Sequence, residues 1–413
     1  MTTHAANLTR DFDAAQVRRL ARPDLAIVTF SGADGGVEKC DRELAMHVHG
    51  LGRRVVIVNT LRDFVTGRLG GRDISVMPAI SGGDRQFSLG RLWSACRLFR
   101  LLKPRAVVFD HTTVLSFTGA MLAARMAGVP RRMAILYSSP TYPRPANYRR
   151  KLGVLPGWWD RRQWVWSMCL NANQHVLFAT REHLERFARD HELEPRGWEV
   201  VPHLGADTEE FRPRPDLRDQ RRQRLGVSDG TLCIGFVGRL SPEKGIDLLL
   251  RALAMLKGSG VPPFACLLAG DGPLRQSLED LAATLGLNAH VRFLGRLERP
   301  AELMAAADIV AVPSREECFG LSLVEAMATE AAVVASTVGG MQEILTSGQD
   351  GLAFPPENVQ ALADALRTLM ADADLRVRLG RLARQTVLRR YSMRQVLDRL
   401  TELLLGEPDS IEP

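Results

Sequence analysis

Seven residues separate two glutamates, Glu317 and Glu325, in the segment PSREECFGLSLVEAM (313–327). An apolar run typical of a strand ends before this segment, and helical periodicity begins near Gly320, with Leu321, Val324 and Ala328 on one buried face. We therefore expect Glu317 in a loop and Glu325 in the second helical turn, both at the carboxyl ends of strands, where open α/β sheets bind ligands. Such carboxylates suit sugar or ribose hydroxyls, and the helix N-terminus suits phosphate. The alternative is that both glutamates are solvated surface charges.

Two cations occupy a similar place in the segment GFVGRLSPEKGIDLLLRAL (235–253). A strand is expected to end at Gly238, a loop carries Arg239 and Lys244, and a helix follows Gly245, a residue that permits a tight turn. Held at the mouth of a parallel sheet, the two cations suit a diphosphate, with arginine as a fork and lysine as a point charge. In the alternative interpretation, both face water. Neither a Walker A loop nor a GxGxxG fingerprint is present.

The elements that must position these residues follow from hydrophobic periodicity. Short apolar runs alternate with helical segments, which predicts parallel, doubly wound sheets buried on both faces. The runs are 25–30, 55–59, 106–109, 133–137 and 175–179, then 232–238, 265–270, 291–295, 308–313 and 332–337. The alternation breaks near 201–216, where proline, glycine and charge cluster. We predict domains at 1–207 and 208–390, with 391–413 as a C-terminal helix that packs back on the first domain.

Composition and cysteine usage narrow the class of protein. With 46% hydrophobic and 24% charged residues, the 413-residue chain resembles a soluble globular protein. It contains no run of about 20 apolar residues and no apolar signal region, and its six cysteines form no CxxC pair. We therefore expect a reduced, cytoplasmic setting. The Asp-x-Asp pairs at Asp11–Asp13 and Asp372–Asp374 follow no strand, and zinc spacing is absent, so no metal site is expected.

Charge is distributed unevenly along the chain. Residues 1–200 carry 30 Lys and Arg against 18 Asp and Glu, a net charge of +12, whereas residues 201–413 carry 24 against 29, a net charge of −5. The excess is greatest over 51–150, and the following segment 147–166 holds four of the six tryptophans. Basic residues among tryptophans suit an anionic membrane interface; alternatively, the tryptophans belong to a core or an acceptor pocket. Nucleic acid is not expected, because no recognised binding motif accompanies the charge.

The motifs together resemble one family. GRL-x2-EKG, LLAGDGP, VRFLG and E-x-FG-x4-E, with GADGGVEK (32–39), FDH (109–111) and VPHLGADTEEF (201–211), are similar to the retaining glycosyltransferases called GT4. This resemblance implies an α/β fold of the GT-B type, with two Rossmann-like doubly wound parallel-sheet domains facing a cleft. The chain departs from the family in two places. Where VPNGVD is usual, it has the longer VPHLGAD. Glu316 also adds a charge beside Glu317 and could share the contact of Glu317 with the donor sugar.

The resemblance also implies roles for individual residues. Arg239 and Lys244 would neutralise the donor diphosphate, Glu317 would bind the donor sugar, and Glu325 the ribose. His111 would lie beside the reacting sugar; the alternative is a histidine whose hydrogen bonds are satisfied at a strand end. The remaining donor-binding residues would be Gly35, Gly36, Gly295, Arg296, Phe319, Gly320 and Leu321.

The implied activity is transfer of a hexose, with retention, from a UDP- or GDP-linked sugar to an acceptor hydroxyl, without cofactor or metal. The acceptor would be a carbohydrate or a lipid-linked or cell-surface glycan precursor, and the enzyme would be cytoplasmic or peripheral on the inner face of the membrane. Two other functions remain open: a nucleotide-sugar 2-epimerase of the GT-B fold, and a non-catalytic nucleotide-sugar-binding subunit.

Overall fold

The computed structural model describes residues 14–29, 36–59, 74–78, 89–111, 118–137, 167–191, 193–194 and 197–406. The chain divides into two compact units. Unit 1 comprises Met1–His203 with Leu397–Pro413, and unit 2 comprises Leu204–Val396. The divisions thus fall a few residues from the positions 207/208 and 390/391 expected from the sequence. Helix α16 (Met393–Leu405) begins in unit 2 and continues into unit 1, which holds all residues after Val396.

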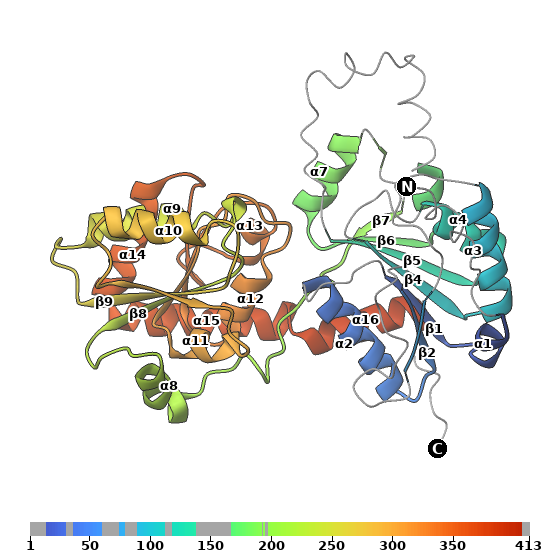
Figure 1. The fold of residues 1–413 in the computed structure, drawn as a ribbon, viewed down its shortest axis with the longest axis horizontal. Helices are drawn as coiled ribbons and strands as arrows, with labels where there is room; N and C mark the ends of the chain where they lie inside the picture. Colours follow the sequence, from blue (N-terminus) through green and yellow to red (C-terminus); the bar gives the residue numbers. More distant parts are fainter. Residues whose placement is uncertain are drawn as a thin grey trace, which may run out of the picture. The chain divides into compact units, whose positions relative to one another are not determined.

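Unit 1 contains a seven-stranded parallel sheet with the order β3-β2-β1-β4-β5-β6-β7. Its strands are β1 (Leu25–Thr29), β2 (Val55–Asn59), β3 (Ser75–Pro78), β4 (Ala106–His111), β5 (Arg131–Leu136), β6 (His175–Phe178) and β7 (Trp198–Val200). Its described helices include α1 (Ala14–Arg19), α2 (Gly36–Gly50), α3 (Leu89–Leu102), α4 (Thr118–Met126) and α7 (Arg181–His191). Figure 1 shows α1, α3 and α4 on one face of this sheet and α2 on the other.

Unit 2 contains a six-stranded parallel sheet with the order β10-β9-β8-β11-β12-β13. The strands are β8 (Leu232–Val237), β9 (Phe264–Ala269), β10 (Val291–Gly295), β11 (Ile309–Val312), β12 (Ala332–Ser336) and β13 (Leu352–Phe354). The helices are α8 (Arg218–Arg224), α9 (Ile246–Leu256), α10 (Arg275–Thr284), α11 (Pro300–Ala306), α12 (Leu321–Ala328), α13 (Met341–Ile344), α14 (Val359–Ala371) and α15 (Ala373–Arg390). Both units therefore have the doubly wound α/β architecture that the sequence predicted.

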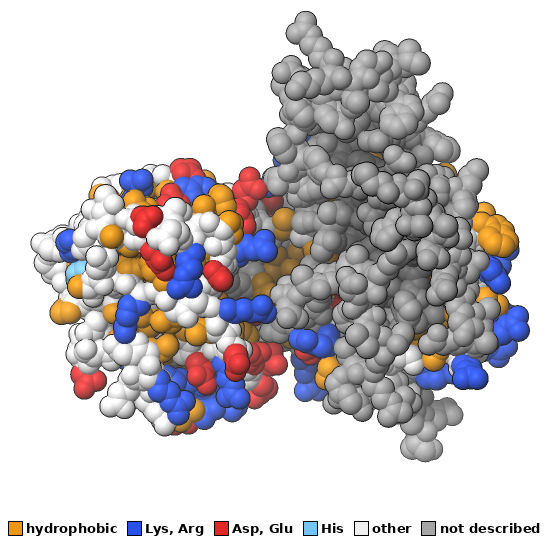
Figure 2. All heavy atoms as spheres, viewed as in Figure 1, with side chains coloured by type: hydrophobic (Ala, Val, Ile, Leu, Met, Phe, Trp, Pro, Cys, Tyr) orange, Lys and Arg blue, Asp and Glu red, His pale blue; other side chains and the backbone are white. Residues whose placement is uncertain are grey.

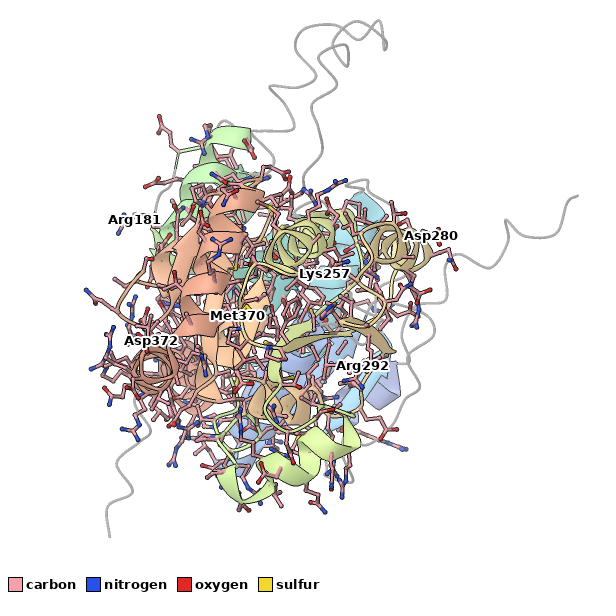
Figure 3. The ribbon with its side chains drawn as sticks, turned by 90° about the vertical axis from the view of Figure 1, so that its left-hand side faces the viewer. Arg181, Lys257, Asp280, Arg292, Met370 and Asp372 are labelled. Atoms are coloured by element: carbon pink, nitrogen blue, oxygen red, sulfur yellow. The ribbon has the colours of Figure 1, made fainter. Side chains whose placement is uncertain are left out.

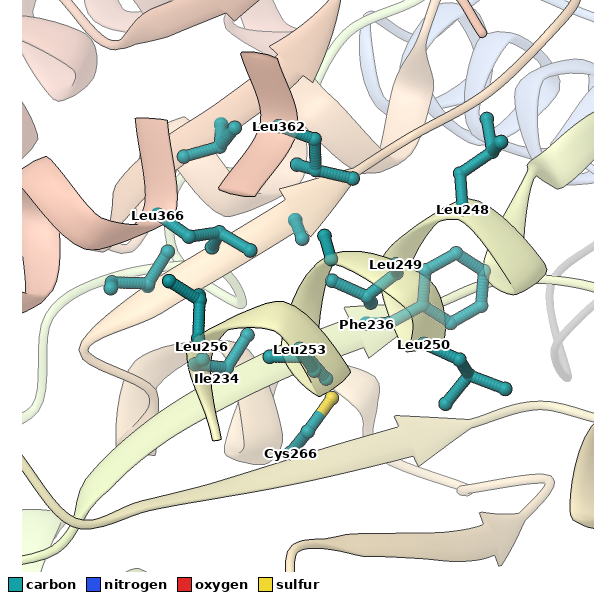
Figure 4. Packing of buried hydrophobic residues seen from close by; sticks show 14 of the residues in the cluster. Ile234, Phe236, Leu248, Leu249, Leu250, Leu253, Leu256, Cys266, Leu362 and Leu366 are labelled. Carbon is teal, nitrogen blue, oxygen red and sulfur yellow. The ribbon is translucent and has the colours of Figure 1, made fainter. Parts of the chain in front are cut away.

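Leucine-rich helix faces hold the core of unit 2 together. Leu249 and Leu253 of α9 are fully buried and pack with Phe236 of β8 and with Leu362 and Leu366 of α14 (Figure 4). Leu248, Leu249 and Ala252, which share one face of this helix, are buried. Burial of each such side chain contributes about 1.5–3 kcal/mol to folding. Both ends of the loop that carries Arg239 and Lys244 are therefore anchored in the core.

Three strands escaped the sequence analysis, and one core assignment was wrong. β7 and β13 have three residues each, and all three residues of β7 are half-buried, so neither presents a long apolar run. β3 spans four residues and includes a proline. Leu321, predicted to face the core with Val324 and Ala328, is only half-buried because it is the first residue of α12.

Candidate functional site

The central pair of strands in unit 2 determines where the candidate residues meet. β8 lies between β9 and β11, and the chain leaves it toward β9 but returns to its other side at β11. This reversal makes the carboxyl ends of β8 and β11 a topological switch point, the usual ligand site of open α/β sheets. The two strands are parallel and in register, with Ile234 opposite Ile309. Consequently, the loops that follow Val237 and Val312 emerge side by side.

An ion pair joins these two loops. Lys244 Nζ lies 2.5 Å from Glu317 Oε2, and both side chains are largely buried, with exposed fractions of 23% and 17%. Lys244 ends a short 3-10 turn, Pro242–Lys244, and Glu317 lies in the loop before α12. The structure thus brings together a predicted phosphate-binding cation and a predicted sugar-binding carboxylate that are 73 positions apart in sequence.

Arg315, which the sequence analysis did not single out, fastens the same two loops. Its guanidinium donates two hydrogen bonds to the carboxylate of Asp247, at 2.7 and 2.8 Å, and one to the carbonyl of Pro242 at 3.1 Å. Its backbone N–H donates to the carbonyl of Glu243 at 2.7 Å. The hydrogen bonds from Arg315 lower the pKa of Asp247, against the effect of burial, and the pKa of Arg315 is raised in turn. The pair therefore stays ionised.

The carboxylate of Glu243, in the 3-10 turn, is also held in its charged form. Burial alone raises the pKa of Glu243, but the hydrogen bond from the Ser241 hydroxyl, a backbone N–H and the charge of Lys244 outweigh it and lower that pKa. The turn that presents Lys244 therefore also carries a fixed negative charge on Glu243.

Two glycines permit the close approach of the loops. Gly245 has φ 63°, and a Cβ atom there would lie 2.0 Å from the carbonyl oxygen of Pro313. Gly339, which follows β12, has φ 50°, and a Cβ atom would lie 1.6 Å from the carbonyl oxygen of Glu317. Real Cβ contacts are never this short, so glycine is required at both positions. The sequence analysis expected this at Gly245 and missed Gly339.

The other donor-side residues lie around the same edge of unit 2. Arg239 follows β8 and is exposed, and Gly295, whose carbonyl accepts from Gly270 N at 2.8 Å, leads to the exposed Arg296. Glu325 is half-buried in the second turn of α12. Phe319 is buried, and its ring centroid lies 5.9 Å from that of Tyr391. Any contact between Phe319 and a ligand must therefore come from its backbone.

In unit 1 the corresponding reversal of strand order lies between β1 and β4. His111 is the last residue of β4, paired in register with Leu136, and the structure describes its backbone but not its side chain. Gly36 begins α2, the helix that follows β1. Gly36 and His111, which the resemblance assigned to the donor site, thus lie on the two sides of the switch point of this sheet. Gly35 and the tryptophan-rich segment 147–166 lie outside the described residues.

Of the two Asp-x-Asp pairs considered for metal binding, one lies at a helix N-terminus and the other lies outside the described residues. Asp372 caps helix α15 (Figure 3), because its carboxylate accepts a hydrogen bond of 2.8 Å from Leu375 N. Asp11–Asp13 lies outside the described residues. Within the described ranges, no three His, Cys, Asp or Glu residues are grouped as metal ligands.

Comparison with known proteins shows which proteins this part of the chain resembles. Residues 218–386 match the family model of glycosyl transferases group 1. Over 215 residues, 49% of the chain and 50% of the relative, the chain is 39% identical to a D-inositol 3-phosphate glycosyltransferase of Corynebacterium urealyticum. Over 224 residues, 51% of the chain and 58% of the relative, it is 34% identical to a GDP-mannose-dependent α-(1-6)-phosphatidylinositol monomannoside mannosyltransferase of Mycolicibacterium smegmatis. The chain thus spans about half the length of these curated relatives.

The fold comparison extends over nearly the whole chain. The crystal structure of Anabaena Alr3699/HepE in complex with UDP matches with a TM-score of 0.76 and 23% identity, covering 92% of this chain and 98% of that one. At this identity the match establishes the fold alone. The two doubly wound units thus have the GT-B fold that the resemblance implied, and residues 218–386 resemble group 1 glycosyl transferases.

Proposed function

We propose that this chain, whose residues 218–386 match the group 1 glycosyltransferase family, transfers a hexose from a UDP- or GDP-linked sugar to an acceptor hydroxyl with retention. The Lys244–Glu317 pair carries this proposal, because it joins a diphosphate-binding cation and a hydroxyl-binding carboxylate at the switch point. Further support comes from the relatives, one of which is named for GDP-mannose, and from a fold neighbour solved with UDP.

In the proposed reaction the bond between the sugar C1 and the diphosphate oxygen breaks, and a bond from the acceptor oxygen to C1 forms on the same face. The acceptor proton passes to the departing diphosphate. Negative charge grows on that leaving group, and Arg239, Lys244 and the N-terminus of α12 would stabilise it. Glu317 and Glu325 would accept hydrogen bonds from the sugar and the ribose, and His111 would lie beside the reacting sugar.

The remaining contacts complete the proposed donor site. Gly35 and Gly36 would let the loop after β1 approach the diphosphate, and Gly295 and Arg296 would border the base. Backbone groups of Phe319, Gly320 and Leu321 would meet the sugar and phosphates. We propose that this set of cations and amide groups serves without a metal ion, so that activity persists in a chelator.

For the acceptor we propose a lipid-linked glycan precursor at the cytoplasmic face of a membrane. The relative named for phosphatidylinositol monomannoside supports a lipid acceptor, and the basic excess of residues 1–200 supports an anionic surface. No helix within the described ranges has the length and apolar character needed to span a bilayer.

Release of nucleoside diphosphate from a panel of nucleotide sugars, with and without acceptor, tests the proposal. Lys244→Ala and Glu317→Ala should each reduce acceptor-dependent release by about 100-fold. Lys257→Ala is the matched control: Lys257 follows the far end of α9, where its Nζ donates to the carbonyl of Gly286 at 2.8 Å, and is labelled in Figure 3. Full activity in Lys244→Ala and Glu317→Ala would refute the transferase proposal, and conversion of the donor without acceptor would indicate an epimerase.

A further inference from the structure

Among the described residues of unit 1, one face carries more basic than acidic side chains. Residues 89–132, which span α3, β4 and α4, contain eight Lys and Arg but a single acidic residue, Asp110, which is buried in β4. α1, which packs on α3, adds Arg18 and Arg19, both exposed. The sequences of α1, α3 and α4 contain no acidic residue, so the outer face of these three helices has a net positive charge among the described residues.

The exposed positions of α3 form one stripe. Trp93, Arg97 and Arg100 follow the spacing i, i+4, i+7, which places them on the same side of the helix, and Lys103 follows at the next turn. The intervening Ala95, Cys96, Leu98 and Phe99 are buried against the sheet. All four residues of the stripe are exposed, so the stripe points away from the core.

Trp93 is the unusual member of this stripe. Its exposed fraction is 65%, although tryptophan side chains are normally largely buried, and its neighbours on the stripe are charged. Met126, at the end of α4, is 53% exposed. A bilayer interface can bury such apolar side chains among cations, because tryptophan favours the headgroup level and basic residues are attracted to anionic lipids.

The three helices lie in a single layer on one side of the sheet (Figure 1), and blue side chains line the corresponding edge of unit 1 in Figure 2. We define this basic layer as Arg18, Arg19, Trp93, Arg97, Arg100, Lys103 and Arg125, which are one tryptophan, exposed cations of α1, α3 and α4, and the lysine that directly follows α3. Its cations come from three helices of one layer, an arrangement that suits a flat surface better than a nucleic-acid strand.

We propose that the basic layer docks unit 1 on an anionic lipid bilayer. This inference extends the proposed function, because it supplies a surface through which the enzyme would reach a lipid-linked acceptor. It assigns the contact to α1, α3 and α4, whereas the sequence pointed to segment 147–166. Because binding rather than transfer is measured below, its failure would leave the transferase proposal intact.

Sedimentation of the full chain with vesicles of phosphatidylcholine, alone or mixed with phosphatidylglycerol, tests the proposal. Binding should require phosphatidylglycerol and weaken as salt shortens the screening length. Each basic residue near the surface contributes about fivefold to affinity, so R97E/R100E, which shifts the charge by four units, should weaken binding about 100-fold or more. Trp93→Ala should weaken it about tenfold by removing buried apolar surface.

The double variant R378E/R381E is the matched control. Arg378 and Arg381 are exposed on α15 of unit 2, and reversing them changes the net charge of the protein by the same amount. Binding should survive in this variant. If both double variants lost vesicle binding equally, the proposal would be overturned, because binding would then depend on the net charge of the protein and not on the basic layer. Retention in R97E/R100E with loss in a variant of Trp158 and Trp159 would transfer the contact to segment 147–166, and capture of a polynucleotide but not vesicles would also overturn it.

Discussion

Lys244 Nζ lies 2.5 Å from Glu317 Oε2 in unit 2, so that the two residues proposed to hold different parts of the donor are paired with each other. A complete nucleotide sugar can give each residue a new partner in place of the ion pair: its phosphates would bind Lys244, and its sugar hydroxyls would bind Glu317. A nucleoside diphosphate can replace only the partner of the lysine and would leave a largely buried carboxylate without its cation, which is costly. The pair should therefore favour donor binding over retention of the product.

The first prediction concerns this discrimination. Glu317→Gln should bind nucleoside diphosphate about tenfold more tightly than the wild type, because Lys244 no longer has a competing ion pair, while affinity for the nucleotide sugar falls. Isothermal titration of both ligands provides the measurement. Glu316→Gln, which removes the same charge from an exposed neighbour, serves as the control.

A double-mutant cycle separates this mechanism from simple repulsion between Glu317 and the diphosphate. In a Lys244→Met background the gain from Glu317→Gln should disappear, since no ion pair remains to be released. An undiminished gain in that background would mean that the carboxylate acts on the ligand directly.

Arg315 should act as a positioning residue. Arg315→Lys removes the two-pronged contact with Asp247 and should lower kcat/KM about tenfold through misplacement of Lys244 and Glu317, with the chain still folded. Arg214→Lys is the matched control, because Arg214 contacts both carboxylate oxygens of Asp216, at 3.0 and 2.9 Å, on the exposed surface of the same unit. Equal kinetics in Arg315→Lys and wild type would contradict the assignment.

The close approach of Gly339 to Glu317 predicts a large loss of stability on substitution. Gly339→Ala places a Cβ against a carbonyl oxygen in a left-handed conformation and should destabilise unit 2 by about 3 kcal/mol. Gly348 also has positive φ, at 80°, but open space around its Cβ position. Gly348→Ala should therefore cost only about 1 kcal/mol of backbone strain. Denaturant unfolding measures both, and equal losses would remove the argument from crowding.

Acid should destabilise unit 1 through His203. Burial, and then the nearby His183, lower the pKa of His203 from 6.5 to about 3, with the ring packed edge-on to Tyr137. Between pH 6.5 and pH 3 the unfolded chain binds a proton that the folded chain does not, so stability falls as pH drops through this range, by up to about 1.4 kcal/mol per pH unit. Thermal unfolding of wild type and His203→Gln from pH 7 to 4 measures this, and the variant should lose part of the dependence.

Local patterns in the sequence were sufficient to predict the fold class and to single out Lys244 and Glu317, which the structure brings together. Apolar runs separated by helical periods report burial on both sides of a strand, and so predicted ten of the strands; β3, β7 and β13 are too short to carry such a pattern. Glu317, Lys244 and Gly245 could be found because a strand end, a glycine and a charge stand together in the chain. Segment 147–166 and Gly35 stay predictions.

Only the tertiary structure decided which of these residues meet. The register of β8 beside β11 places Lys244 against Glu317, although no periodicity links positions so far apart. The same strand order brings the guanidinium of Arg315 to the carboxylate of Asp247. The pairing of β11 with β12 brings Gly339 against the carbonyl of Glu317. Residue type and local spacing determine what a side chain can do, but strand order and packing determine its partner.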